Sequence, residues 1–171
     1  LGWEDKDEWR PVLEVLNALP LTHITLHPRI GTQQYKGEVD MESFRAFYEA
    51  CRHPLVYNGD IHTLADISSL EEAYPRLAGV MIGRGLLARP SLAIEYITGQ
   101  EWSPEKRRKL MTDLHQALME HWQPLMNSDA QLLNKLRTFW EYAEEEIGRK
   151  LYKKLMKSGS QKNYLSAIRE I

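Results

Sequence analysis

Three short apolar runs alternate with helix-like segments in the first hundred residues, and this alternation limits the possible folds more than any other feature. The runs THITLH (22–27), PLVYN (54–58) and AGVMIG (78–83) are apolar or β-branched and are bounded by turn residues, as buried strands are. Strands separated by helices are joined by crossovers and form a parallel sheet. The pattern therefore predicts an α/β region with about three strands, too few to close a barrel.

The segments between these runs have apolar residues at helical spacing. The first of them, residues 7–19, places five apolar residues on one stripe: Trp9, Val12, Val15, Leu16 and Leu19. Residues 41–52 predict a second helix, and the chain's single cysteine, Cys51, falls on its apolar stripe. A capping-box pattern at Thr63 predicts the start of a third helix over 63–74.

After residue 99 the strand signal ends, and the rest of the chain predicts helices alone. Ser103 followed by Pro104 has the pattern of an N-cap and a first helical residue. A second helix is expected over about 128–147, a short basic helix over 149–157, and a last one from about residue 161. This part of the chain therefore predicts a small helical bundle.

Charge is distributed unevenly between the two predicted domains, residues 1–99 and 100–171. Residues 1–100 contain 9 basic and 14 acidic side chains, whereas 101–171 contain 13 basic and 10 acidic ones. From position 149 onward, seven lysines and arginines face a single acidic residue, Glu170. The net charge of −2 indicates no polyanionic partner for the whole chain, but the basic C-terminal region is compatible with one.

Several classes of protein and site are disfavoured by composition. A single cysteine excludes an internal disulfide framework and a four-cysteine zinc site, and it suits a reducing cytoplasm, where we expect the protein. No apolar run approaches the roughly 20 residues of a membrane span, and no signal-peptide pattern is present, so we expect no membrane partner. His115 and His121 fall on different faces of their helix, so we expect no metal site.

Polar loops follow the first two predicted strands, on the side where parallel α/β folds bind ligands. The loop HPRIGTQQYKG (27–37) contains His27 and Arg29 and suits an anionic or heteroaromatic ligand; a solvated loop with one structural histidine is the alternative. The second loop, Asn58-Gly59-Asp60, can form a tight turn in which Gly59 permits a positive φ and a close approach of the backbone. Ordinary turn chemistry explains that tripeptide equally well.

The third predicted strand runs into Gly83-Arg84-Gly85. Glycines let backbone N–H groups come close to a phosphate, and an arginine adds a charge-assisted contact. Such a turn alone is more often structural. Together with the loop one βα unit earlier, however, it predicts a phosphate site in the last two βα loops, a position that many (β/α)₈ barrels use.

The motifs ITLHPRIGTQQYKG, VYNGDI and GVMIGRGLLARP, in this order and spacing, resemble the C-terminal half of the flavin-dependent tRNA-dihydrouridine synthases. The resemblance implies the last part of a (β/α)₈ TIM barrel, followed by a helical domain. It also implies an FMN enzyme that takes a hydride from NADPH and reduces the C5–C6 bond of uridine in tRNA. The flavin performs the redox step, and the protein positions it.

By position, the resemblance assigns roles to several residues. Six would bind the cofactor: His27 at the isoalloxazine ring; Asn58, Gly59 and Asp60 on the ribityl-phosphate side; and Gly83 and Arg84 at the phosphate. Arg29 would lie near the uridine. Beside a tRNA-modifying family, the basic run supplies four candidate contacts to RNA phosphates: Lys150, Lys153, Lys154 and Lys157.

The family's proton-donating cysteine and a flavin-contacting lysine would both lie upstream of Leu1, so no catalytic residue is expected in this chain. Cys51 is expected to be a buried structural residue. We therefore expect a fragment with about half an active site and with weak or no flavin retention. The alternatives are a non-catalytic RNA-binding module and another FMN barrel, such as one of the dihydroorotate dehydrogenase type; the basic run could also be a solvated helix face.

Overall fold

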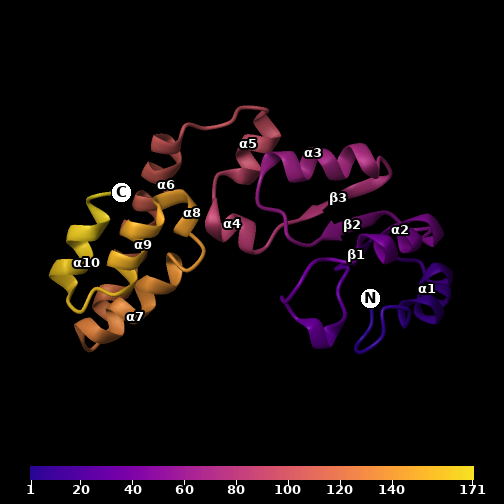
Figure 1. Ribbon diagram of the computed structural model, residues 1–171, viewed down its shortest axis with the longest axis horizontal. Helices are drawn as coiled ribbons and strands as arrows, with labels where there is room; N and C mark the ends of the chain where they lie inside the picture. The colour runs from indigo at the N-terminus through magenta and orange to yellow at the C-terminus, as the bar shows by residue number, and fades with distance from the viewer. The chain divides into compact units, whose positions relative to one another are not determined.

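The computed structural model describes residues 1–171 and is an α/β structure with ten α-helices and one three-stranded sheet (Figure 1). The chain divides into two compact units, Leu1–Ile82 and Gly83–Ile171. The first unit contains the sheet, and the second is helical. The functional division predicted between residues 99 and 100 stays a prediction.

The sheet confirms the three predicted strands and their parallel order. Its strands are β1 (Ile24–Leu26), β2 (Leu55–Asn58) and β3 (Leu77–Met81), in the order β1-β2-β3. Leu26 pairs with Tyr57 and Asn58 pairs with Met81, so the three strands end at one edge. The loops that follow β1 and β2 therefore leave the sheet side by side.

Three helices accompany the sheet: α1 (Trp9–Ala18), α2 (Met41–Ala50) and α3 (Leu64–Ala73), with a 3₁₀ turn η1 (Gly31–Gln33). The capping box at Thr63 is present as predicted, and the Asp40 carboxylate caps α2 by accepting from the Ser43 N–H at 2.9 Å. Phe44 of α2 lies edge-on to Tyr57 and Tyr74, with ring centroids 4.9 and 5.0 Å apart. This aromatic cluster forms the centre of the first unit's core.

The predicted apolar stripe of α1 is only partly correct. Trp9 and Leu13 are buried, whereas Val12, Val15 and Leu19 are exposed. At 100° per residue, positions 9, 13 and 16 fall on one face and positions 12, 15 and 19 on the adjoining one. The sequence pattern merged two apolar faces, of which one packs in this structure.

The second unit contains seven helices: α4 (Arg84–Ala88), α5 (Leu92–Thr98), α6 (Pro104–Trp122), α7 (Asp129–Phe139), α8 (Glu144–Ile147), α9 (Arg149–Met156) and α10 (Gln161–Ile168), with a 3₁₀ turn η2 (Gln123–Leu125). Ser103 caps α6 with Pro104 in its first turn, as predicted. The single helix expected over 128–147 is wrong. The Trp140 N–H bonds the carbonyl three residues back, at Arg137, and this tight turn ends α7 before α8 begins.

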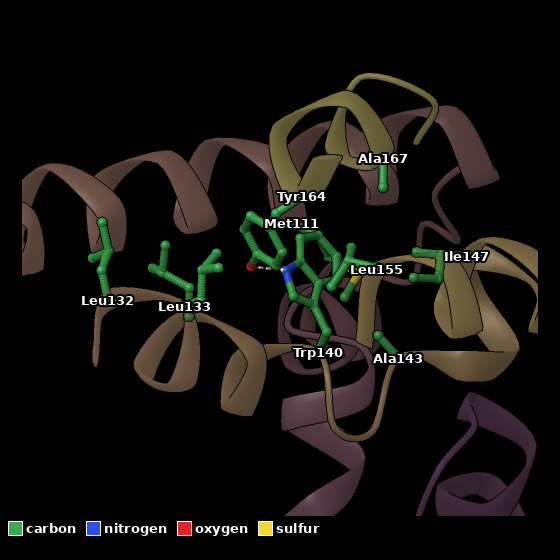
Figure 2. Packing of buried hydrophobic residues seen from close by; sticks show 10 residues of the cluster. Met111, Leu132, Leu133, Trp140, Ala143, Ile147, Leu155, Tyr164 and Ala167 are labelled. Carbon is green, nitrogen blue, oxygen red and sulfur yellow. Dashed lines mark hydrogen bonds between the residues drawn. The ribbon is translucent and has the colours of Figure 1, made fainter. Parts of the chain in front are cut away.

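A buried aromatic network lies at the centre of the second unit (Figure 2). Trp140 Nε1–H donates to Tyr164 Oη at 3.1 Å, and that hydroxyl lies 2.8 Å from His115 Nε2. All three residues are at most 1% exposed. The Tyr164 hydroxyl thus serves both ring nitrogens, and these polar atoms of the core satisfy one another.

Candidate functional site

The loops after β1 and β2 are joined by an ion pair between Arg29 and Asp60. Arg29 Nη1 donates to Asp60 Oδ1 at 3.1 Å, and Nη2 bonds the second carboxylate oxygen. The Arg29 side chain is only 3% exposed, whereas that of Asp60 is 32% exposed. A two-bond pair of this kind fixes the guanidinium plane as well as its position. The two loops predicted to bind the cofactor are thereby held together.

Arg29 makes two further contacts within its own loop. Nη2 donates to the Gly37 carbonyl at 2.7 Å, and Nη1 lies 3.2 Å from His27 Nε2. The pKa of Arg29 is raised by its hydrogen bond to Asp60, which outweighs the opposing effect of burial, so the group stays charged. Its Nε is buried and has no hydrogen-bond partner. Arg29 is thus the centre of a cluster formed with His27, Gly37 and Asp60, which we call the sheet-edge cluster.

The turn between β2 and α3 does not use the positive φ that Gly59 permits. Gly59 does not have a positive φ; the next residue, Asp60, does, at 36°. Aspartate is one of the few residues besides glycine that adopt this region, and here its carboxylate binds Arg29 of the neighbouring loop. Gly59 is needed for space instead, since a Cβ there would lie 3.0 Å from both Tyr57 Oη and Val39 Cγ1.

Two other residues at this edge support the loops. Asn58 donates from Nδ2 to the Met81 carbonyl at 2.7 Å and so joins the ends of β2 and β3. Beneath the turn, Tyr57 is buried, and burial together with the nearby Asp60 carboxylate raises its pKa to about 12. The Tyr57 hydroxyl therefore remains protonated at physiological pH. The cofactor contact predicted for Asn58 stays a prediction.

Gly83 and Arg84 begin the second unit. Gly83 precedes the first turn of α4, and a Cβ built there would meet nothing within 4 Å. Arg84 is the first residue of that helix and is half-buried. The backbone around Gly83 is therefore open, while Gly85 is buried inside the short helix. The predicted phosphate contacts of Gly83 and Arg84 stay predictions.

The four lysines predicted to contact RNA lie on α9 or at its C-terminal end, and all are exposed. Lys154 forms an ion pair with Glu170, and both side chains are half exposed. A groove of about 400 Å³ lies beside this helix end, lined by Lys154, Lys157, Ser158, Gly159, Asn163 and Ser166. The Leu155 side chain is buried in the core, so α9 has one packed face and one cationic face.

One buried charged group escaped the sequence analysis. Glu95 of α5 is wholly buried and accepts from Arg89 Nε at 3.0 Å, from Ser91 Oγ at 2.5 Å and from the Trp102 backbone N–H at 2.7 Å. Burial alone would raise its pKa, but these donors outweigh burial and lower the pKa to about 2. The i, i+4 spacing of Ser91 and Glu95 was the only available signal. This network ties the residues after α4 to the start of α6.

Two classes of feature are absent from the structure. No three His, Cys, Asp or Glu side chains gather where they could hold a metal ion. None of the helices has both the length and the apolar character needed to cross a bilayer.

Comparison with known families identifies the chain's relationships. The family model described as dihydrouridine synthase matches residues 1–170. The chain belongs to the dihydrouridine synthase family. The resemblance seen in the three loop motifs is therefore confirmed, and the match also extends through the helical unit, where the sequence motifs were weakest.

Individual members of the dihydrouridine synthase family show the same relationship. A probable tRNA-dihydrouridine synthase of Rickettsia bellii is 29% identical over 133 residues, which cover 74% of this chain and 39% of that protein. A probable tRNA-dihydrouridine synthase of Rhizobium leguminosarum is 34% identical over 53% of this chain and 28% of that protein. The tRNA-dihydrouridine(16) synthase of Pseudomonas syringae is 32% identical over 59% of this chain and 32% of that protein. The chain matches well under half the length of each.

Proposed function

We propose that the protein containing this chain reduces the C5–C6 bond of uridine in tRNA to dihydrouridine, using NADPH as reductant and FMN as the bound cofactor. The family match over residues 1–170 is the observation that carries this proposal. The sheet adds support, because the polar loops after β1 and β2 leave it at one edge, as in a segment of a (β/α)₈ barrel.

The residues at the sheet edge are suited to a flavin. A flavin offers ring carbonyl and phosphate oxygens, and Arg29 Nε is a buried donor that lacks an acceptor. His27, Asn58, Gly59 and Asp60 would lie on the ring and ribityl side, while Gly83 and Arg84 would bind the phosphate, where the backbone is open. When bound, FMN supplies the hydride transfer. The protein's contribution is to hold and orient it.

The proton that completes the reduction at C5 needs an acid, and this chain does not supply a suitable thiol. Cys51 is buried, and its Sγ lies 3.6 Å from the His53 carbonyl, to which it donates. A buried cysteine of this kind behaves as a small apolar residue. We assign the proton donor to a residue outside positions 1–171.

For tRNA, we propose that the cationic face of α9 contacts the phosphate backbone. Lys150, Lys153 and Lys157 are exposed, and their spacing of three and four residues puts them on one side of the helix. Phosphate contacts of this kind position a nucleic acid without reading its sequence. Lys154 would contribute less, because it forms an ion pair with Glu170.

The test is conversion of an unmodified tRNA transcript by the whole protein with FMN and NADPH. We expect nucleosides from the digested tRNA to include dihydrouridine, heavier than uridine by two hydrogens, and omission of NADPH to abolish it. Residues 1–171 alone should give none. A well-folded whole protein that binds no flavin, or that leaves uridine unchanged, would contradict the proposal.

A non-catalytic RNA-binding module is the second candidate. The observation that favours it is the cationic face of α9, together with burial of the chain's single cysteine, Cys51. It predicts tRNA binding that persists without flavin and is not accompanied by dihydrouridine formation in the whole protein.

A further inference from the structure

The cationic face of α9 contains one contact to a carboxylate, the ion pair between Lys154 and Glu170. Lys154 Nζ donates to Glu170 Oε1, and each side chain is 50% exposed. Glu170 lies just after α10 and is the only acidic residue beyond position 148. Lys150, Lys153 and Lys157 form none of the ion pairs in the structure. The single carboxylate of this basic region is thus bound to one of the four lysines.

Lys154 borders two surface grooves, and Glu170 borders one of them. The groove described above, of about 400 Å³, lies beside the end of α9 and is also lined by Lys157. A second groove, of about 530 Å³, lies beside the start of α9. Its other lining residues are Ile147, Gly148, Arg149, Lys150, Leu151 and Glu170. The ion pair therefore places a carboxylate at a groove whose remaining charged side chains are all cationic.

An ion pair between half-exposed side chains is weak, and it changes an equilibrium constant by about fivefold or less. A contact between an exposed lysine and an RNA phosphate is an interaction of the same kind. Lys154 must give up the Glu170 carboxylate to make such a contact, so its net gain is close to zero. The unpaired lysines of α9 give up only water and counterions.

We propose that Glu170 withholds Lys154 from RNA and thereby limits the affinity of α9 for the phosphate backbone. Lys150, Lys153 and Lys157 contact phosphates, while Lys154 stays with Glu170. Glu170 is thus an affinity-determining residue that acts through a lysine and does not itself bind RNA. This inference rests on the proposed RNA contact of α9 and names the residue that sets its strength.

Removing any carboxylate makes a chain more attractive to a polyanion, so the test needs a matched control. The Lys109–Asp113 pair of α6 supplies one. Lys109 Nζ lies 2.7 Å from Asp113 Oδ2, and the two side chains are 74% and 60% exposed. Asp113→Asn therefore changes the net charge as Glu170→Gln does, but it releases no lysine of α9.

The experiment measures binding of a tRNA transcript to the 171-residue chain over a range of salt concentrations. We expect Glu170→Gln to bind about fivefold more tightly at 0.1 M salt. Its slope of log affinity against log salt should be steeper by roughly 0.7–0.9, as for one added phosphate contact. The charge-neutral double variant Lys154→Met/Glu170→Gln should bind like the wild type, because Lys154 contacts no phosphate in either. Asp113→Asn should stay close to the wild type.

The proposal would be overturned if Glu170→Gln gained no affinity, or gained no more than Asp113→Asn. A double variant that bound clearly more weakly than the wild type would also overturn it, because Lys154 would then contact RNA despite Glu170. Failure of the proposed RNA contact gives a different result. In that case Lys150→Glu/Lys153→Glu/Lys157→Glu would bind tRNA as the wild type does, whereas a loss in that triple variant without a gain in Glu170→Gln counts only against the role of Glu170.

Discussion

His27 and His115 each make a side-chain hydrogen bond at Nε2, but with different partners in different surroundings. His27 is half-buried and faces the ion-paired guanidinium of Arg29, between loops at the end of the sheet. His115 is 1% exposed and faces the neutral Tyr164 hydroxyl inside an apolar core. The first bond lies at the proposed cofactor site, whereas the second lies in the core of the helical unit.

The same contrast applies to charge. In the first unit the buried charge is Arg29, in a loop at the sheet edge, where we propose that the cofactor binds. In the second unit the buried Glu95 is fully engaged within the protein, and the groups proposed to act on RNA are exposed lysines of α9. The helical unit should therefore lose stability when its buried polar groups change, and lose only RNA affinity when its surface lysines change.

The largest expected effect comes from Glu95→Ala. This variant leaves the mostly buried Arg89 and the Trp102 N–H without their carboxylate partner, and removing one member of a buried pair costs about 3–5 kcal/mol. Glu101→Ala is the matched control, because Glu101 also pairs with Arg89 but is 65% exposed; it should cost about 0–1 kcal/mol. Urea unfolding followed by circular dichroism measures both, and equal losses would contradict the contrast.

Acid should weaken the helical unit through His115. Burial lowers the pKa of His115 from 6.5 to about 4, so the unfolded chain binds the proton more readily within that range. The part of the unfolding free energy that depends on a neutral His115 is therefore fully present above pH 6.5 and is lost as the pH falls toward 4. It amounts to about 3 kcal/mol. We expect His115→Phe to lose this part of the pH dependence of the unfolding free energy and the exposed His121→Gln to keep it. A wild-type pH dependence that persists in His115→Phe would show that other groups cause it.

Glu95 should affect the unfolding free energy at lower pH than His115 does. Its pKa is lowered from 4.5 to about 2, so its contribution is present above pH 4.5 and is lost as pH falls below that value. Glu95→Gln should therefore flatten the unfolding free energy below pH 4.5 and leave the His115 range unchanged. A change confined to the range above pH 4.5 would contradict the assignment.

A smaller effect is expected from Tyr164→Phe. The hydroxyl serves both His115 Nε2 and Trp140 Nε1, and its loss leaves both atoms buried without a partner, at about 1–3 kcal/mol. Tyr142→Phe, at a residue 39% exposed, should change stability by about 0.5 kcal/mol or less. Equal unfolding free energies for the two variants would show that the hydrogen bonds of the Tyr164 hydroxyl do not stabilise the core.

The strands and most helix starts were predictable because local patterns determine them. The runs around β1, β2 and β3 are bounded by turn residues, and the side chains of Thr63 and Ser103 cap their helices within three residues. The exposed face of α1 was not predictable, since periodicity cannot show which of two adjoining apolar faces packs. The end of α7 at Phe139, where the Trp140 N–H bonds the Arg137 carbonyl, has no local sequence signal either.

At the site, the sequence identified the residues but not their pairing. His27, Arg29 and Asp60 were each singled out, yet the Arg29–Asp60 ion pair joins residues 31 positions apart and depends on the parallel register. The sequence suggested that Gly59 permits a positive φ, whereas crowding by Tyr57 and Val39 is what requires the glycine. Glu95 carries no motif, so only its burial reveals it.

The division of roles between the units is tested most directly by the salt dependence of tRNA binding to this chain. In Lys150→Glu/Lys153→Glu/Lys157→Glu, the slope of log affinity against log salt concentration should become shallower by roughly two to three, at about 0.7–0.9 for each lost phosphate contact. Lys106→Glu/Lys109→Glu/Lys135→Glu makes the same charge change elsewhere on the helical unit and should leave the slope nearly unchanged. Equal changes in the two triple variants, or no change in the first, would contradict the account.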